Sequence, residues 1–215
     1  MLKKLLLSLA LAALIAPPAA AHPHVWIDSA SEILFDASGR ITAIRHHWRF
    51  DEAFSAYAIQ GLDTDGDGTY SKAELDPLAE VNVTSLSEFA FFTFMAIGEK
   101  DVAFSEPRDY WLDLADGFLT LHFTLPLTEP VKPDAAAVLE VYDPEYFVAF
   151  ELPSTEAVRL VDAPAGCGLT VQLARELDAD ATAALAEIGP EQRELPDELK
   201  DLTDGLDNSA TLNCG

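Results

Sequence analysis

Cysteine, methionine and basic residues are scarce in this chain of 215 residues. It contains two cysteines, two methionines and 13 lysines and arginines, against 37 acidic residues, so its formal net charge is -24. A protein this acidic repels nucleic acid and anionic lipid headgroups, and it concentrates cations around itself. The composition therefore argues against a nucleic-acid partner and favours metal ions or basic partners.

The common catalytic motifs are also absent. The chain has no Gly-x-Ser-x-Gly nucleophile motif, no His-Glu-x-x-His zinc motif, no Walker phosphate loop and no dinucleotide-binding fingerprint. Hydrophobic residues make up 49% of the sequence, which suits a folded chain and not a disordered or fibrous one. We therefore expect a folded binding or structural protein that is not an enzyme.

One apolar run near the start is too short to span a membrane and has the length of a secretory signal. Lys3 and Lys4 precede the apolar segment 5–16, and three alanines ending at Ala21 supply the small residues that signal peptidase recognises. We predict a signal peptide over 1–21 that is cleaved on export. The mature chain is not expected to insert into the membrane.

Export decides how the two cysteines are interpreted. Cys167 and Cys214 form an even pair in an oxidising compartment, without Cys-x-x-Cys spacing and without a histidine nearby in the sequence. We expect a disulfide between them that ties the acidic tail from Gly189 onward to the rest of the chain. A metal–thiolate site, the alternative, lacks the further ligands that it would need.

A turn signal predicts a hairpin at the start of the mature chain. Ser38 and Gly39 separate two alternating runs, and a two-residue turn there pairs residues whose numbers sum to 77. In this register apolar residues such as Ile33 and Ile44 face one another on one side of the strands. Opposite charges face one another on the other side.

The second half of the chain shows further strand patterns. Asp116-Gly117 predicts a hairpin between 109–115 and 118–125, in which Trp111 faces His122. Further strands are expected at 102–104, 137–142, 146–152, 158–161 and 169–173, followed by a short helix at 179–188.

The segment between the hairpins has helical periodicity over 52–61 and 71–97, and the loop between these stretches, 63–74, matches an EF-hand calcium loop. Calcium takes roughly six to eight oxygen ligands, and an EF-hand supplies them from loop positions 1, 3, 5, 7, 9 and 12, with glycine at position 6. Those ligand positions hold Asp63, Asp65, Asp67, Thr69, Ser71 and Glu74, and Gly68 is the sixth residue. No second loop of this kind occurs, so we expect a structural calcium site. The alternative is a surface turn that binds no ion.

These patterns predict an α+β fold. An antiparallel sheet or loose sandwich carries an inserted helix–EF-hand loop–helix unit and one disulfide. After the signal peptide, we expect an N-terminal hairpin with the EF-hand region over 22–98. A C-terminal antiparallel β region with a short helix and a disulfide-tied tail follows over 99–215, within one domain or two subdomains.

The histidines suggest a second metal site. His22 and His24 lie at the predicted mature N-terminus, where the free amine and the imidazole of His22 can chelate a transition metal. The hairpin register places His24 near Asp51, and it places His46 and His47 on opposite faces of their strand. We therefore expect a transition metal at His22 and His24, with Asp51, His46 and His47 as further candidate ligands.

Two of the histidines have simpler interpretations. A hydrogen-bonded core histidine is an equal alternative for His46, and His122 is expected to be a packed residue on an outer face. A copper carrier that uses the N-terminal histidine brace is a further alternative for the whole chain. So is a structural or interaction protein whose only ion is calcium.

Several segments together carry a family resemblance. They are the start His22-Pro23-His24-Val25-Trp26-Ile27-Asp28, the acidic loop entering Glu74-Leu75, the segment Tyr142-Asp143-Pro144-Glu145-Tyr146-Phe147, and the late Cys167 and Cys214. The chain resembles a bacterial periplasmic family of unknown function, described as the periplasmic component of an uncharacterised ABC-type transport system. The resemblance implies an accessory to the transport of zinc, nickel or cobalt that works with an inner-membrane metal permease. His22 and His24 match the family's motif.

Overall fold

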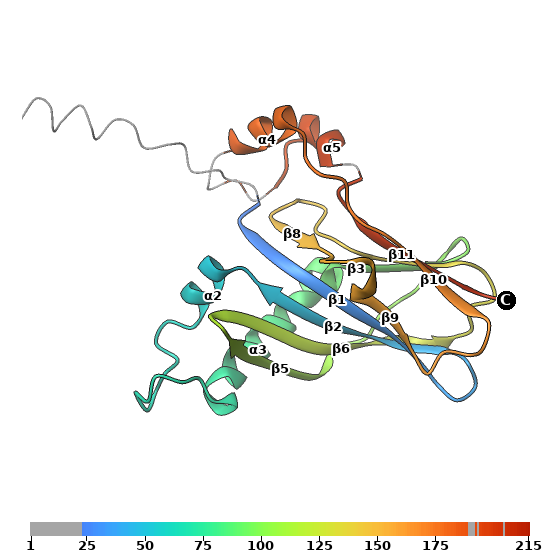
Figure 1. Cartoon of the computed structure of the whole chain (residues 1–215), viewed down its shortest axis with the longest axis horizontal. Helices are drawn as coiled ribbons and strands as arrows, with labels where there is room; N and C mark the ends of the chain where they lie inside the picture. Colours follow the sequence, from blue (N-terminus) through green and yellow to red (C-terminus); the bar gives the residue numbers. More distant parts are fainter. Residues whose placement is uncertain (1–22, 189–191, 193, 204) are drawn as a thin grey trace, which may run out of the picture.

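The strands of the computed structural model form two sheets that pack against each other (Figure 1). It describes residues 23–188, 192, 194–203 and 205–215, so the predicted signal peptide and His22 lie outside the described residues. Buried and more exposed residues alternate along most strands, which is the pattern of a strand with one face in the core. The expected α+β class with one disulfide is confirmed.

The first sheet has the strand order β5-β6-β2-β1-β8, and β9 also pairs with β1. Its strands are β1 (Val25–Phe35), β2 (Ile41–Phe50), β5 (Arg108–Ala115), β6 (Phe118–Val131), β8 (Val148–Glu151) and β9 (Val158–Val161). β8 and β9 run parallel to β1, so this edge departs from the expected antiparallel arrangement. The chain enters β8 from a strand of the other sheet, and such a crossover permits parallel pairing where a tight hairpin does not.

The second sheet has the order β10-β11-β7-β3-β4. Its strands are β3 (Thr93–Ile97), β4 (Lys100–Asp101), β7 (Ala137–Val141), β10 (Cys167–Gln172) and β11 (Asn208–Cys214). Cys167 and Cys214 are directly opposite each other in β10 and β11 and form the predicted disulfide. The strand expected at 102–104 is reduced to an isolated bridge between Phe104 and Leu127.

Both predicted hairpins form in the predicted register. In the first, pairs from Ile27 opposite Phe50 to Leu34 opposite Ala43 sum to 77, and a bulge follows. The turn is longer than the two residues expected, because Asp36 and Arg40 close it and Gly39 adopts a positive φ of 76° inside it. In the second hairpin Trp111 faces His122, as predicted.

The predicted helix over 71–97 is wrong in its second half. Helix α3 (Lys72–Ser85) passes into the 3-10 helix η1 (Leu86–Phe92), where three successive residues, Ala90 to Phe92, have positive φ values that end the helix. The remaining residues form β3, whose residues alternate between buried and half-buried and pair with β7. Apolar residues at spacings of three predicted a helix over this segment. Over 93–97, however, the burial of side chains repeats every two residues, which is the period of a strand.

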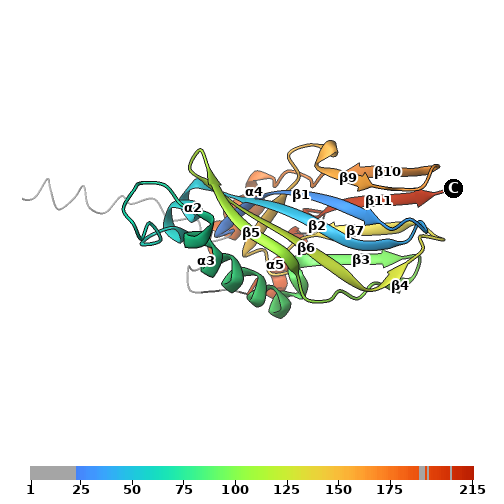
Figure 2. The ribbon, with the colours of Figure 1, turned by 90° about the horizontal axis from the view of Figure 1, so that it is seen from below.

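The inner face of the first sheet is covered by two different elements. Trp48, Phe50 and Leu121 pack with Leu75 and Ala79 of α3, whereas other inner residues of the same strands pack against β3, β7 and β11. In Figure 2, α3 lies along β5, and β3, β7 and β11 lie toward the end that carries the C-terminus. The helix and the second sheet thus share one apolar surface.

The acidic tail belongs to the fold. Helices α4 (Ala179–Ala186) and α5 (Asp197–Thr203) lie together above the sheets in Figure 1, and β11 enters the second sheet between β10 and β7. Leu212 of β11 is fully buried. The disulfide ties the tail to the rest of the chain as expected, and β11 also contributes backbone pairing on both of its edges. The helix predicted at 179–188 is confirmed.

Candidate metal sites and an acidic cavity

The predicted calcium loop joins α2 (Glu52–Ala58) to α3. Asp51 caps α2 by accepting a hydrogen bond from the backbone N–H of Phe54. Ser71 and Glu74 form a capping box at the start of α3, in which each side chain accepts a bond from the other residue's backbone. The loop therefore begins after one short helix and ends in a well-defined helix start, as an EF-hand requires.

Three of the six predicted calcium ligands are close together. One ligand oxygen each from Asp63, Asp65 and Asp67 lie within 4.8 Å of one another, and the side chains are largely exposed. The Asp63 carboxylate accepts hydrogen bonds from the backbone N–H groups of Gly66 and Gly68, which fold the loop around it. The Asp65 carboxylate likewise accepts from the N–H of Asp67, and in this folded loop the three carboxylates lie near a single point.

Glu74 lies outside this group of three. Its carboxylate oxygens accept bonds from Thr64 on one side and from Ser71 on the other, so it connects the two ends of the loop. The hydrogen bonds from Ser71, followed by those from Thr64, lower the pKa of Glu74 to about 2. The side chain is thus an ionised carboxylate at neutral pH that is bonded to Ser71 of the same loop.

The structure does not assemble the N-terminal histidine site from the residues that it describes. His24 stacks on Phe147 with ring centroids 4.4 Å apart, and its backbone N–H donates to the Phe147 carbonyl. The Asp51 carboxylate accepts bonds from the N–H groups of Trp26 and Phe54. Within the described ranges, no metal-like group of three histidine, cysteine or acidic side chains includes His24 or Asp51.

His46 lies in the core, where both ring nitrogens have hydroxyl partners. The ring is fully buried, Nδ1 is 3.1 Å from the Ser31 hydroxyl and Nε2 is 3.3 Å from that of Thr93. Thr93 donates its own proton to the Phe91 carbonyl, so it accepts from Nε2–H, and Nδ1 accepts from Ser31. Burial lowers the pKa of His46 to about 3. These contacts favour the alternative of a hydrogen-bonded core histidine.

His47 lies on the opposite, outer face of the first sheet and meets a histidine from another strand. It is paired with His122 of β6, and the two Nδ1 atoms are 2.6 Å apart. His122 Nε2 is 2.7 Å from a carboxylate oxygen of Asp113, and the ring of Trp111 stacks on His122 at 4.6 Å. The hairpin register in the sequence predicted that Trp111 faces His122. The contact between His47 and His122 depends on the pairing of β2 with β6, which joins residues 75 apart in the sequence, and no local pattern predicts it.

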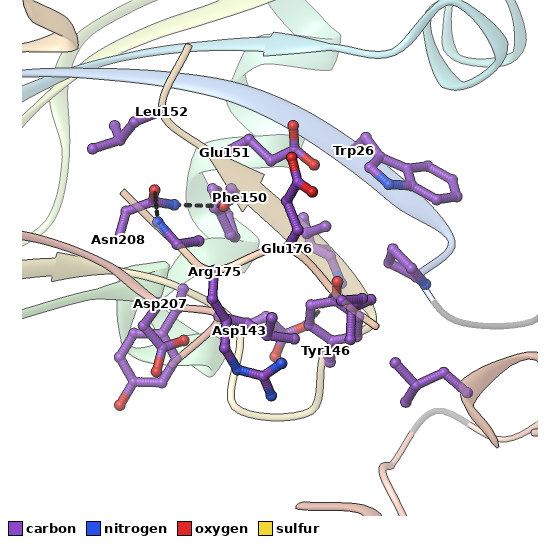
Figure 3. A pocket seen from close by; sticks show the side chains of 18 of the residues that line it. Trp26, Asp143, Tyr146, Phe150, Glu151, Leu152, Arg175, Glu176, Asp207 and Asn208 are labelled. Carbon is purple, nitrogen blue, oxygen red and sulfur yellow. Dashed lines mark hydrogen bonds between the residues drawn. The ribbon is translucent and has the colours of Figure 1, made fainter. Parts of the chain in front are cut away.

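Two of the segments that carry the family resemblance, 22–28 and 142–147, meet at one cavity. The start of β1 pairs with β8, which follows the 142–147 segment, and a cavity of about 550 Å³ opens beside them (Figure 3). Its walls include Trp26, Tyr142, Asp143, Tyr146, Glu151, Arg175, Glu176, Asp207 and Asn208. The two motifs, distant in sequence, therefore shape the same concave surface.

The cavity wall combines aliphatic and aromatic side chains with four carboxylates and one arginine. The side-chain amide of Asn208 links two segments of the wall. Its NH₂ group donates to the Phe150 carbonyl, and its oxygen accepts from the Ala174 N–H (Figure 3). Asp143 accepts three backbone N–H bonds from residues 145, 147 and 148, although burial raises its pKa on balance. Carboxylates beside aromatic rings favour cationic ligands over anionic ones.

Comparison with known proteins identifies the family. The pattern that defines the protein family of unknown function DUF1007 matches residues 7–214. The chain belongs to this family. DUF1007 accordingly accounts for the resemblance seen in the segments at 22–28 and 142–147.

Two relatives of this DUF1007 protein are described as uncharacterised proteins. A protein of Haemophilus influenzae is 27% identical over 141 residues, which cover 64% of this chain and 66% of that protein. A 15.5 kDa protein of Spirochaeta aurantia, from the trpE 3′ region, is 24% identical over 110 residues, or 50% of this chain and 79% of its own length. Among the described residues no helix is long and apolar enough to cross a membrane.

Proposed function

We propose that this DUF1007 protein is an exported calcium-binding protein that acts as an accessory to transition-metal transport. The observation that carries the calcium assignment is the convergence of Asp63, Asp65 and Asp67 within 4.8 Å in a loop of EF-hand length. Three carboxylates so close together repel one another, and a divalent cation relieves that repulsion.

The donor set selects calcium over softer metals. The six loop positions offer only oxygen, which hard cations prefer, and the loop contains no imidazole or thiolate. Asp63, Asp65, Asp67 and Glu74 would supply carboxylate oxygens, Thr69 its carbonyl and Ser71 its side chain or a bound water. When bound, calcium supplies charge neutralisation and cross-links the loop.

The position of the loop indicates a structural role for the ion. The loop precedes α3, and α3 buries Leu75, Ala79 and Val83 against the inner face of the first sheet. An ion that fixes the loop therefore also fixes the first turn of the helix that covers this part of the core. A single hand without a partner hand has no paired groove to open.

The transport role is supported by charge and chemistry. The chain carries a formal charge of -24, which concentrates cations near its surface. Imidazole side chains suited to zinc, nickel or cobalt occur at His22 and His24 in the segment that resembles the family motif. The proposed partner is an inner-membrane metal permease, and the proposed compartment is the periplasm.

Thermal unfolding in calcium tests the first half of the proposal. With a dissociation constant near 10⁻⁴ M, 10 mM calcium stabilises a protein by about 2.7 kcal/mol, which raises its Tm by roughly 5–10 °C at this size. Asp63→Asn and Asp65→Asn keep the acceptor oxygen of each side chain and should abolish the rise. Asp101→Asn removes the same charge from an exposed strand and should not. Equal Tm rises in all four proteins would refute the calcium site.

Metal analysis tests the second half. The processed protein is purified from the periplasm without chelator or affinity tag, and its zinc, nickel and cobalt content is measured. We expect one of these metals in addition to calcium. A protein that carries calcium alone, and that binds none of the three metals on later titration, is a structural protein without a transport role.

A further inference from the structure

The outer face of the first sheet carries a histidine pair with the features of a metal site. Three strands contribute side chains to one row across this face: Trp111 from β5, His122 from β6 and His47 from β2. Asp113 follows Trp111 by two residues and so projects from the same face. None of these groups belongs to the calcium loop, and His47, a candidate ligand of the predicted N-terminal site, meets His122 here.

The two imidazoles direct the same nitrogen toward a common point. The Nδ1 atoms of His47 and His122 are 2.6 Å apart, and their rings meet edge-on at 69°. An ion with metal–nitrogen bonds of about 2.0–2.1 Å in a tetrahedral site holds two such nitrogens roughly 3.3 Å apart. The rings therefore need to separate by less than about 1 Å to admit an ion.

Asp113 prepares His122 to act as a ligand. Its carboxylate is 2.7 Å from His122 Nε2; in the tautomer whose Nε2–H donates to Asp113, His122 Nδ1 has a lone pair and accepts from Nδ1–H of His47. Metal binding at both Nδ1 atoms then moves the His47 proton to its Nε2 by exchange with water. Metal-binding histidines commonly donate their other ring proton to a carboxylate in this way. Trp111 stacks on the same ring with an interplanar angle of 10°, which limits its rotation.

The charged groups beside His47 are paired with one another. Glu32 of β1 and Arg45 of β2 are bonded to each other, and Arg159 occupies the second oxygen of Glu32. The ring of His47 is half-buried on this face, and imidazole binds a metal in its neutral form.

We infer that His47 and His122 bind a divalent transition-metal ion through their Nδ1 atoms, with Asp113 as a positioning residue behind His122. The choice of a transition metal rests on the proposed function, and imidazole ligands suit zinc, nickel and copper. Two protein ligands leave coordination positions for water or for a partner's side chain. Such an incomplete site can release its ion, as a carrier that hands metal to a permease must do.

Zinc titration followed by calorimetry and by histidine ¹⁵N NMR tests the inference. The full mature chain is saturated with calcium first, so that added zinc chloride does not occupy the carboxylate loop. We expect one zinc site whose binding moves the Nδ1 signals of His47 and His122. His47→Gln and His122→Gln should each remove that site, whereas the double variant His22→Ala/His24→Ala should retain it.

A second pair of variants tests the positioning role. Asp113→Asn should weaken zinc binding about 10–100-fold and change the tautomer signals of His122. Asp109→Asn removes the same charge from the same strand, where the side chain is 74% exposed, and should leave both readouts unchanged. A purely structural Asp113 would alter stability without changing the His122 tautomer.

The outcomes separate this inference from the proposed function. If zinc binding survives both single histidine variants but is lost in His22→Ala/His24→Ala, the inference fails and the transport proposal stands. If the wild-type chain binds no zinc, nickel or cobalt, both fail. If either histidine variant does not fold, the ¹⁵N spectra of the wild-type protein test the inference instead. Nδ1 signals of His47 and His122 that do not move at saturating zinc would show that the two rings only share a hydrogen bond and bind no metal.

Discussion

The stability of this protein should depend on pH through His46. The ring is fully buried between Phe123 and Trp48, and its nitrogens are bonded to Ser31 and Thr93. Burial lowers its pKa in the folded protein to about 3, against an ordinary value of 6.5. The unfolded chain therefore binds a proton on this histidine between pH 6.5 and pH 3, and the folded protein does not.

The sign and size of the effect follow from proton linkage. Because the unfolded state binds more protons in this window, the free energy of unfolding rises with pH there and is lost as pH falls. The loss is about 1.4 kcal/mol per pH unit, or roughly 2 kcal/mol between pH 6.5 and pH 5.0. Extended to pH 3 it approaches 5 kcal/mol, which is comparable with the whole stability of many domains.

Urea unfolding of the wild type and of His46→Gln at pH 7.5 and pH 5.0 measures this contribution. Glutamine can still donate toward Thr93 but does not titrate, so the variant should lose roughly 2 kcal/mol less than the wild type over this interval. The difference between the two proteins in how the free energy of unfolding changes with pH isolates the contribution of His46, because the other histidines and the carboxylates contribute equally to both. An equal pH dependence in both proteins, or an NMR titration of His46 near pH 6, would refute the reasoning.

Three further changes probe the fold. Replacing Cys167 and Cys214 by alanine opens a link across 47 residues and should cost about 4 kcal/mol in urea unfolding; a loss below 1 kcal/mol would contradict the loop-entropy estimate. Leu212→Ala should cost about 2–5 kcal/mol because the side chain is fully buried in β11, and a neutral result would mean that this strand is not part of the core. Asp51→Ala removes the cap of α2 and should cost about 1 kcal/mol, while Asp51→Asn should cost much less, as measured by thermal unfolding; equal losses would exclude the capping role.

Features that depend on near neighbours in the chain were predictable. Turn residues and alternating patterns set the register in which Ile33 faces Ile44 and Trp111 faces His122, since a slip of one residue would expose the apolar set. The spacing of acids over 63–74 and the even pair of cysteines likewise carry their chemistry in the sequence itself. The carboxylate convergence and the disulfide agree with those patterns.

Other local patterns were ambiguous, and only packing resolved them. The residues over 93–97 fit both helical and strand spacing, and pairing with β7 decided for the strand. The tail has the composition of a loop, yet its last residues fill a central position in the second sheet. Burial against partners distant in sequence determined these elements, and such partners are invisible to a short window.

The sequence by itself determined the hairpin registers, the calcium-loop pattern and the disulfide, because each depends on the chemistry of a few residues at fixed spacing. Only the tertiary structure decided which histidine meets which. Pairing of β2 with β6 placed His47 beside His122 on the outer face, and the same strand turned His46 into the core between two hydroxyls. Adjacent residues of a strand point to opposite faces of the sheet. His46 therefore lies on the face that packs in the core, and His47 lies on the outer face, where it meets His122.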